Sequence, residues 1–573
     1  MLTLTAAFLF LQGCFLAPTY KRPPVETPPA FKEATPGAAW KTATPKDAFP
    51  RGAWWEIFGD PQLNALEQKL SVSNQNVQQA MAAYREARAL VKETRAAYFP
   101  TVGTVPSITR ERLPPVTTNG NPNSGTSSTV NLFDLPVTAA WEPDLFGAVT
   151  FAVRTAKAEV QASAAQLQGI LLSMQGDLAS DYFALQELDM QTTVLNTAVA
   201  SYEKFLQLTQ ARFSGGVASR ADVAQAEAQM DQTLAQATDL GIARAQNEHA
   251  IAVLIGQAPS TFSLPLGRIR SAPPPIPTGL PSDLLERRPD IASAERLIVA
   301  ANGQIGLARA AYFPTVSLTA TGGYESNTLA DWFTWPQRFW SIGASAADTL
   351  LDFGRRSAVS EQAHAIYDAQ VAAYRQTVLA AFQEVEDNLA ALRLLEQEAG
   401  QQDSAVKAAE DSLNLEVLQY KAGTVSYLNV ITTQNIALTN EVAAAQILGR
   451  RMTAAVTLIM AVGGGWDISQ LPWPYNLESL PKASTASVTA LGLPNPPAPV
   501  IPVNTSSGTI VNPVPAPVSF SSGAVTVPSI APSVMSSTTT LLPPPIPVVV
   551  STATTTTAPP AVSTPTVPAT PSK

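Results

Sequence analysis

The chain has 573 residues, of which 14% are Asp, Glu, Lys or Arg, and its formal net charge is −9. A charged fraction well below the ~25% of soluble proteins indicates that much of the surface does not face bulk water. The negative charge argues against a nucleic-acid-binding surface, which needs clustered Lys and Arg. Two histidines and one cysteine leave little for metal ligation or His-based catalysis, and they exclude an intrachain disulfide. We therefore expect no metal, no cofactor and no enzymatic activity.

The first residues have the pattern of an export signal. Met1–Phe10 is almost wholly apolar and is followed by Leu11-Gln12-Gly13-Cys14. A short apolar stretch before a small residue is typical of a secretory signal, and the last four residues resemble the bacterial lipobox. We expect residues 1–13 to be a signal peptide and Cys14 to be lipidated, since acyl chains contribute about 0.8 kcal/mol per buried CH₂. The alternatives are a buried thiol and, because no Lys or Arg precedes the apolar stretch, a start upstream of Met1.

After Cys14, no uncharged apolar run reaches the ~20 residues that a membrane-spanning helix needs. Any membrane crossing would therefore use strands. The proline-rich stretch Pro18–Pro50 predicts an extended arm, within an N-terminal segment over residues 14–60. Helical periodicity then begins near Pro61, where proline suits the first turn, and Pro100 follows its end at Ala97.

Two strands are predicted next, at Thr101–Arg110 and Val130–Trp141, separated by a turn-rich loop over Pro114–Ser128. In the second strand, apolar residues alternate with Asp134 and Thr138, which is the period of a strand between two environments. An ordinary soluble hairpin is the alternative. The first hairpin is expected to span residues 101–141.

A very long helix is predicted after this hairpin, from Gly147 to Phe213, with a turn at Ser214–Arg220 and a returning helix over Ala221–Ile255. None of the residues of the long helix is proline. About 65 residues at 1.5 Å each extend roughly 100 Å, which no compact domain accommodates.

The second half repeats this plan. The eight residues Arg95–Val102 recur as Arg309–Val316, 214 positions later. At the end of the long helix, Tyr420 takes the place that Phe213 has in the first half, 207 positions earlier. We expect one structural unit duplicated in tandem. The second copy comprises a hairpin over 315–350, a long helix from Gly354 to Tyr420, a turn at Lys421–Tyr427 and a returning helix over Leu428–Val462. The long helix has a coiled-coil seam, formed by Val371, Tyr374, Val378, Ala381, Val385, Asn388, Leu392 and Leu395.

Two segments lack periodic structure. The proline-rich residues 263–281 are expected to link the repeats. Residues 467–573 are rich in Pro, Thr and Ser, and their composition predicts disorder or an extended conformation. The predicted organisation is therefore a first repeat at 61–262, the linker, a second repeat at 282–466 and the tail.

Helix, hairpin, long helix, turn and returning helix, made twice behind a lipobox, resemble the TolC-type outer membrane efflux family, in its branch of OprM-like and NodT-like lipoproteins of RND pumps. Further motifs carry the likeness: Trp54-Trp55 with Phe58-Gly59-Asp60-Pro61, Arg287-Arg288-Pro289-Asp290, Leu351-Asp352-Phe353-Gly354 and Gly463-Gly464-Gly465-Trp466. The resemblance implies a mainly α protein with membrane β-structure. Three chains with four strands each would form a twelve-stranded outer-membrane barrel, continued by a periplasmic helical barrel.

The resemblance also implies partners and a gate. The chain would be the passive channel through which drugs or other small toxic solutes are exported, working with a periplasmic adaptor and an inner-membrane RND pump. The adaptor would contact the two tips at Gly215, Gly216, Val217, Ala422, Gly423 and Thr424. The aperture would involve Tyr420, with Asn429 and Thr432 where relatives carry carboxylates. Asp222 would either supply the missing charge or serve only as a helix-start acid.

A second hypothesis is a lipid-anchored periplasmic coiled-coil scaffold without a pore. It would explain the heptads and Cys14, but it leaves the two alternating hairpins without a role. The substrate cannot be read from these residues.

Overall fold

The computed structural model describes residues 19–33, 53–113, 127–276 and 281–466. The chain separates into two units, Met1–Ser484 and Thr485–Lys573. Every described residue belongs to the first unit. The predicted signal peptide, the lipidation site Cys14 and the Pro/Thr/Ser-rich tail therefore lie outside the described residues.

The stretch in which the periodicity predicted one helix forms two: α2 (Pro61–Ser73) and α3 (Gln75–Ala96). The helix breaks at Asn74, whose backbone is extended with ψ at 126°. Its side-chain oxygen accepts the N–H of Val77 and so caps α3, while its amide donates to Leu254 O at 2.8 Å. The prediction of one continuous helix is therefore wrong, because a carbonyl 180 residues away holds the break.

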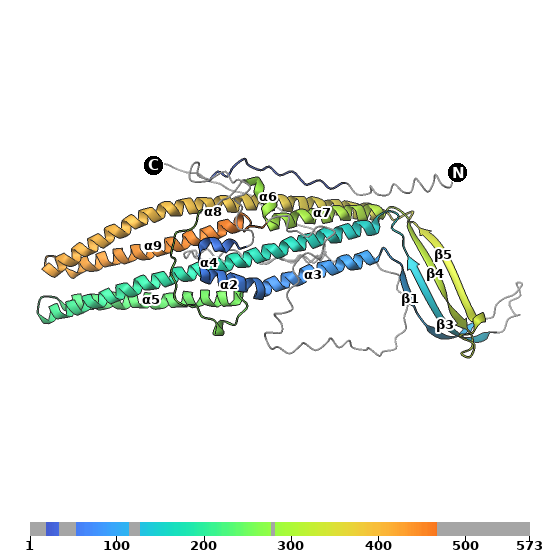
Figure 1. The fold of residues 1–573 in the computed structure, drawn as a ribbon, viewed down its shortest axis with the longest axis horizontal. Coiled ribbons are helices and arrows are strands. Elements are labelled where there is room, and N and C mark those ends of the chain that lie inside the picture. Colours follow the sequence, from blue (N-terminus) through green and yellow to red (C-terminus); the bar gives the residue numbers. More distant parts are fainter. Residues whose placement is uncertain (1–18, 34–52, 114–126, 277–280, 467–573) are drawn as a thin grey trace, which may run out of the picture. The chain divides into compact units, whose positions relative to one another are not determined.

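The strands of both repeats form one antiparallel sheet (Figure 1). β1 (Thr101–Thr104) and β2 (Ser107–Leu113) both pair with β3 (Ser128–Trp141), which pairs with β4 (Thr315–Ser326), which in turn pairs with β5 (Arg338–Ala347). β1 and β2 act as one strand, which is interrupted at Pro106 because proline has no N–H to donate to the neighbouring strand. The predicted hairpins are confirmed, and the sheet is four strands wide, with outer edges that have no partner among the described strands.

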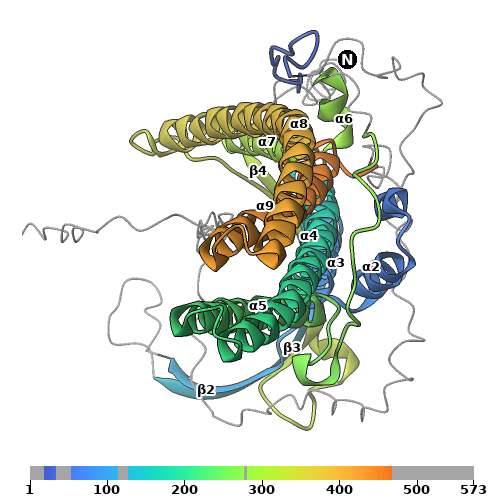
Figure 2. The same cartoon turned by 90° about the vertical axis from the view of Figure 1, so that its left-hand side faces the viewer.

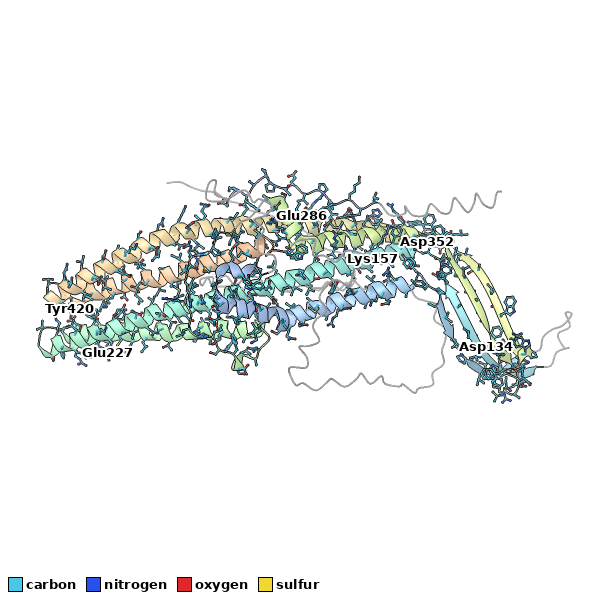
Figure 3. The ribbon with its side chains drawn as sticks, in the orientation of Figure 1. Asp134, Lys157, Glu227, Glu286, Asp352 and Tyr420 are labelled. Atoms are coloured by element: carbon cyan, nitrogen blue, oxygen red, sulfur yellow. The ribbon has the colours of Figure 1, made fainter. Side chains whose placement is uncertain are left out.

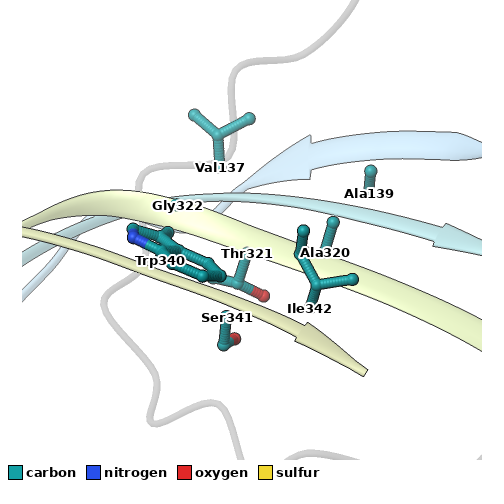
Figure 4. A pocket seen from close by; sticks show the side chains of 8 residues that line it. All are labelled: Val137, Ala139, Ala320, Thr321, Gly322, Trp340, Ser341 and Ile342. Atoms are coloured by element: carbon teal, nitrogen blue, oxygen red, sulfur yellow. The ribbon is translucent and has the colours of Figure 1, made fainter. Parts of the chain in front are cut away.

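The sheet has one apolar and one polar face. On the apolar face, Gly322 lies opposite both Val137 and Trp340 in the strand register. Figure 4 shows the shallow groove that these residues line together with Ala139, Ala320 and Ile342. The polar face places Asp134 opposite Glu325, and Thr138 opposite Thr321. This alternation fits strands that separate hydrocarbon from water.

The two long helices are α4 (Ala148–Ser214) and α8 (Arg355–Ala422), of 67 and 68 residues. Each turns back into a 35-residue helix, α5 (Arg220–Leu254) or α9 (Tyr427–Ala461). The resulting α4/α5 and α8/α9 hairpins run side by side, and their turns lie at the end of the helices farthest from the sheet (Figures 1 and 2). The two hairpins confirm the predicted duplication.

The predicted seam of α8 is buried at Tyr374, Val378, Ala381 and Val385. Farther along, the buried position shifts from Asn388 to Leu389, and the seam is buried again at its predicted position Leu395.

Helix α9 has the length and composition of a membrane span. It packs along α8 and α4, however, and Val456, Leu458 and Ile459 are fully buried there. Its apolar residues are therefore those of a helix inside a bundle.

The remaining described elements are α7 (Pro289–Ala310), which packs against α4 and α8, and five short helices: η2 (Trp54–Phe58), η3 (Pro259–Thr261), η4 (Pro281–Asp283), α6 (Leu284–Arg287) and η5 (Trp335–Gln337). The largest apolar cluster lies around η2, where Trp54 is fully buried and its indole N–H donates to Gln175 Oε1 at 3.3 Å. This cluster joins α2, α4 and α9 in the middle of the helical region.

Residues 19–33 of the N-terminal arm bind the outside of the second repeat. The Tyr20 hydroxyl donates to Glu295 on α7 at 3.1 Å. Farther along, the Glu386 carboxylate on α8 accepts the backbone N–H groups of Lys32 and Glu33 at 2.7 and 2.9 Å. Residues 19–33 are therefore extended, as predicted, and are attached to α7 and α8. The prediction of an extended arm over all of 14–60 is wrong at Trp54–Phe58, which form the helix η2 because their aromatic side chains are buried in the apolar cluster.

Candidate functional site at the helical tips

The two turns that join α4 to α5 and α8 to α9 have the same backbone structure. Gly216 (φ +74°) and Gly423 (φ +80°) end the long helices in the left-handed conformation. The next N–H groups, of Val217 and Thr424, donate back into the last helical turn at 2.8 and 3.0 Å. This Schellman arrangement satisfies helix-end carbonyls, and glycine adopts it without steric cost. The repeat in the sequence is thus a repeat in the backbone of the tips.

The six residues predicted to contact an adaptor all lie at the surface of the described protomer: Gly215, Gly216, Val217, Ala422, Gly423 and Thr424. Val217 is 70% exposed, so an apolar side chain faces outward at the first tip. The second tip presents Thr424 at the matching place, where its hydroxyl is already bonded to Gln419 O.

Arg212, near the end of α4, connects the two tips. Its Nη1 donates to Tyr420 O at 2.7 Å, and its guanidinium lies 4.6 Å from the centre of the Tyr420 ring. Tyr420, labelled in Figure 3, is 4% exposed, and its hydroxyl is 3.5 Å from Thr209 Oγ1. Charge-assisted hydrogen bonds are stronger than neutral ones, and stacking on a ring adds a cation–π attraction. The predicted gate tyrosine is therefore held between the hairpins by a residue of the other repeat.

Tyr427, the first residue of α9, completes this contact. Its ring centre lies 5.5 Å from that of Tyr420, and Ala226 and Val430 beside it are fully buried. Burial, followed by the charges of Tyr420, Tyr202 and Asp222, raises the pKa of Tyr427 well above its ordinary value. The phenol consequently stays neutral.

Asp222 caps helix α5. Its carboxylate accepts the Ser219 N–H at 2.8 Å, and the Ser219 hydroxyl accepts the Asp222 N–H at 3.1 Å. These reciprocal bonds form a capping box, which satisfies two N–H groups at the start of a helix. Of the two roles considered for Asp222, the geometry supports that of the helix-start acid.

Asn429 and Thr432 lie exposed on α9, on a different face from the buried Tyr427 and Val430. The Asn429 side-chain oxygen accepts from the Ser426 hydroxyl at 3.3 Å, and the Thr432 hydroxyl donates to Leu428 O at 2.9 Å. Both are uncharged, and neither belongs to the cluster around Tyr420.

Arg212 was not among the predicted site residues. The arginine that contacts Tyr420, in the second tip, comes from the first tip. Arg212 lies in the last turn of α4, where basic residues are common because they interact favourably with the carbonyl end of a helix. Its position alone was therefore only a weak sign of a role at the tips. Among the described residues, no three His, Cys, Asp or Glu side chains gather in a way that could hold a metal.

A family model described as outer membrane efflux protein matches residues 66–257 and 280–464. The chain is 31% identical over 473 residues to the toluene efflux pump outer membrane protein TtgF of Pseudomonas putida, which covers 81% of this chain and 96% of TtgF. It is 29% identical over 477 residues to the pyoverdine export outer membrane protein OpmQ of Pseudomonas aeruginosa, with 81% and 97% covered.

Solved structures are also similar. The outer-membrane channel OprN matches with a TM-score of 0.73 and 27% identity, over 79% of this chain and 100% of OprN. The open state of the Neisseria gonorrhoeae MtrE outer membrane channel matches with a TM-score of 0.67 and 25% identity, over 79% of this chain and 98% of MtrE.

Proposed function

The chain belongs to the outer membrane efflux protein family, and from this premise we propose that its two helical tips form the gate of the channel. It is an outer-membrane channel of an efflux pump. Three chains with a sheet four strands wide each build a twelve-stranded barrel, continued by a barrel of long helices, because lipid cannot satisfy the open edges of one sheet. The fold and function predicted from the sequence are confirmed, and a scaffold without a pore does not fit a family of channels.

The contact of Arg212 with Tyr420 is the observation that best supports a gate at the tips. It joins the end of α4 to the end of α8 through a 2.7 Å hydrogen bond and a stacked ring. Separating the hairpins at their tips would break both interactions and expose Tyr420. A channel that must open for its cargo and close afterwards needs such a contact, strong enough to hold and local enough to be released.

We place the narrowest ring of the closed gate at Asn429 and Thr432, repeated three times around the axis. Rings of carboxylates make a pore cation-selective, but these positions carry only an amide and a hydroxyl. We propose that Asp222, whose carboxylate accepts the Ser219 N–H, caps α5 and does not supply the aperture charge. The aperture is accordingly polar and weakly selective.

Planar-bilayer recordings of Asn429→Asp, Thr432→Asp and Asp222→Asn test this proposal. The first two variants should acquire cation selectivity, seen as a shifted reversal potential in a salt gradient, while Asp222→Asn should leave the selectivity unchanged. Unchanged reversal potentials in both aspartate variants would place the constriction elsewhere. A loss of cation preference in Asp222→Asn would assign the aperture charge to Asp222.

We further propose that Cys14 is lipidated, as its lipobox predicts, and the arm supports this by its length. Tyr20 is fixed at Glu295, which lies 15 residues, or about 22 Å of helix, from the sheet end of α7 at Ala310. The six residues from Cys14 to Tyr20 extend to about 20 Å. The arm is therefore long enough to bring Cys14 to within a few ångströms of the base of the sheet, where an acyl chain on Cys14 would meet the leaflet.

The proposed partners are a periplasmic adaptor, which would bind the six exposed tip residues, and an inner-membrane RND pump. The relatives are named for toluene, antibiotic and pyoverdine export. We propose drugs or other small toxic solutes as the cargo of this chain. The division into two repeats, 61–262 and 282–466, with a linker over 263–281, is proposed as its domain organisation.

A further inference from the structure

We propose that a neutral amide pair, Gln229 on α5 and Asn435 on α9, is a second lock of the closed channel, set back from the tips. This inference rests on the proposed gate and adds to it a residue pair that holds the hairpins together. Gln229 Nε2 donates to Asn435 Oδ1 at 2.7 Å, and Asn435 Nδ2 donates to Gln229 Oε1 at 3.2 Å. Each amide thus gives and accepts one bond, across two helices from different repeats.

The position of the pair matters because α5 and α9 meet only locally. Within each hairpin the two helices pack along their length, but between α5 and α9 the described contacts are few. Asn435 lies eight residues, about 12 Å along the helix, from Tyr427 in the tip cluster. The amide pair is therefore a separate connection between the returning helices, while Arg212 and Tyr420 connect the long ones.

Gln229 is held in place for this role. It is 9% exposed, and it lies beside Tyr202 of α4. When the pair breaks, the nearly buried Gln229 amide is left without a hydrogen-bond partner, which costs free energy. The exposed Asn435 amide can instead bond to water. Opening the hairpins is thus opposed at Gln229 more strongly than a surface hydrogen bond would oppose it.

An amide pair neither titrates nor is screened by salt as an ion pair is. The closed state held by this lock should therefore be insensitive to pH and ionic strength in the physiological range. A net hydrogen bond changes an equilibrium by roughly two- to tenfold, so removing both bonds in each of three protomers should produce a measurable rise in the open fraction.

The test compares planar-bilayer recordings of trimers carrying Gln229→Met, Asn435→Leu or both changes. Each single change removes the pair with a side chain of similar size, and each should raise the open probability at least about tenfold. The double variant should rise no further, because the same interaction is lost. Gln232→Met, an exposed amide on the same helix, is the matched control and should behave as the wild type.

Gln229→Glu gives a readout that a merely structural role would not produce. Protonated, the introduced carboxyl can donate and accept as the amide does; ionised, it can only accept. The open probability of this variant should rise with pH between 4 and 7, while that of the wild type stays level. A flat profile, or additive effects in the double variant, would overturn the lock.

Arg212→Ala separates this inference from the gate on which it rests. If Arg212→Ala opens the channel and the Gln229 and Asn435 variants do not, the tip gate stands and the amide lock is wrong. If none of these variants changes the conductance, the gate does not lie at the tips, and the proposal of an amide lock is wrong as well.

Discussion

At the scale of single residues, Glu67 has the most unusual environment. Its side chain on α2 is fully buried, and neither carboxylate oxygen has a hydrogen-bond partner in the described part of the chain. Burial alone raises the pKa of Glu67 to about 9. With no cation to compensate, a charged carboxylate is disfavoured there, so Glu67 is protonated in the folded protein at neutral pH.

Glu67 should make the protein less stable as pH rises. Between the ordinary pKa of 4.5 and about 9, the folded state keeps a proton that the unfolded state releases. Stability therefore falls through this window, by up to about 1.4 kcal/mol per pH unit. Glu67→Gln cannot ionise, so its Tm should decline less between pH 5 and 8 in thermal unfolding of the purified protein. The exposed Glu227→Gln is the control, and equal slopes for Glu67→Gln and wild type would contradict the argument.

Arg212 and Tyr420 illustrate what residue patterns could and could not predict. The repeated motif identified both tips, and family resemblance identified Tyr420. The contact between them joins positions 208 residues apart, which no local periodicity encodes. For the same reason Asp222 remained ambiguous, because its role depended on whether its carboxylate was already bound to Ser219.

At the scale of secondary structure, the helices and strands followed their sequence signals closely. Proline-free periodicity predicted α4 and α8, and alternation predicted β3. The break at Asn74 was missed because a distant carbonyl causes it. The sequence analysis predicted one strand where β1 and β2 are separate, although Pro106 lies between them. The register with β3 is the same on both sides of the interruption.

The tip turns depend on glycine. At Gly423, where φ is +80°, a side chain costs about 1–2 kcal/mol. Gly423→Ala should therefore speed amide hydrogen exchange over residues 421–427 and lower the Tm. Gly400→Ala, inside α8 with open space at its Cβ position, should instead stabilise the helix by up to about 1 kcal/mol. If both substitutions acted alike, the left-handed turn would not be the cause.

The arm is a second element whose attachment can be tested. Glu386→Gln keeps the shape of the side chain but removes the charge that accepts the N–H groups of Lys32 and Glu33. Limited proteolysis should then cut within residues 19–33 faster than in the wild type. Glu384→Gln, which loses an ion pair to Arg288 instead, should leave that cleavage unchanged. Equal cleavage of the arm in wild type and Glu386→Gln would show that this carboxylate does not hold it.

At the scale of the whole molecule, the channel follows from the edges of the sheet. One chain leaves β5 and the β1/β2 edge without strand partners in its described part. Unpaired backbone groups cannot be satisfied by lipid, so the edges of neighbouring copies must pair until a barrel closes. The long helices of each chain then continue the barrel, and the six tips of three chains lie at its far end.

The most direct test of this account is the conductance of purified trimers in planar bilayers, wild type against Arg212→Ala. Loss of the guanidinium removes the bond to Tyr420 O and the stacked ring together. We predict a mostly closed wild type and an Arg212→Ala channel whose open probability is at least about tenfold higher. A wild type that is already open, or a variant that conducts as the wild type does, would contradict a gate at the helical tips.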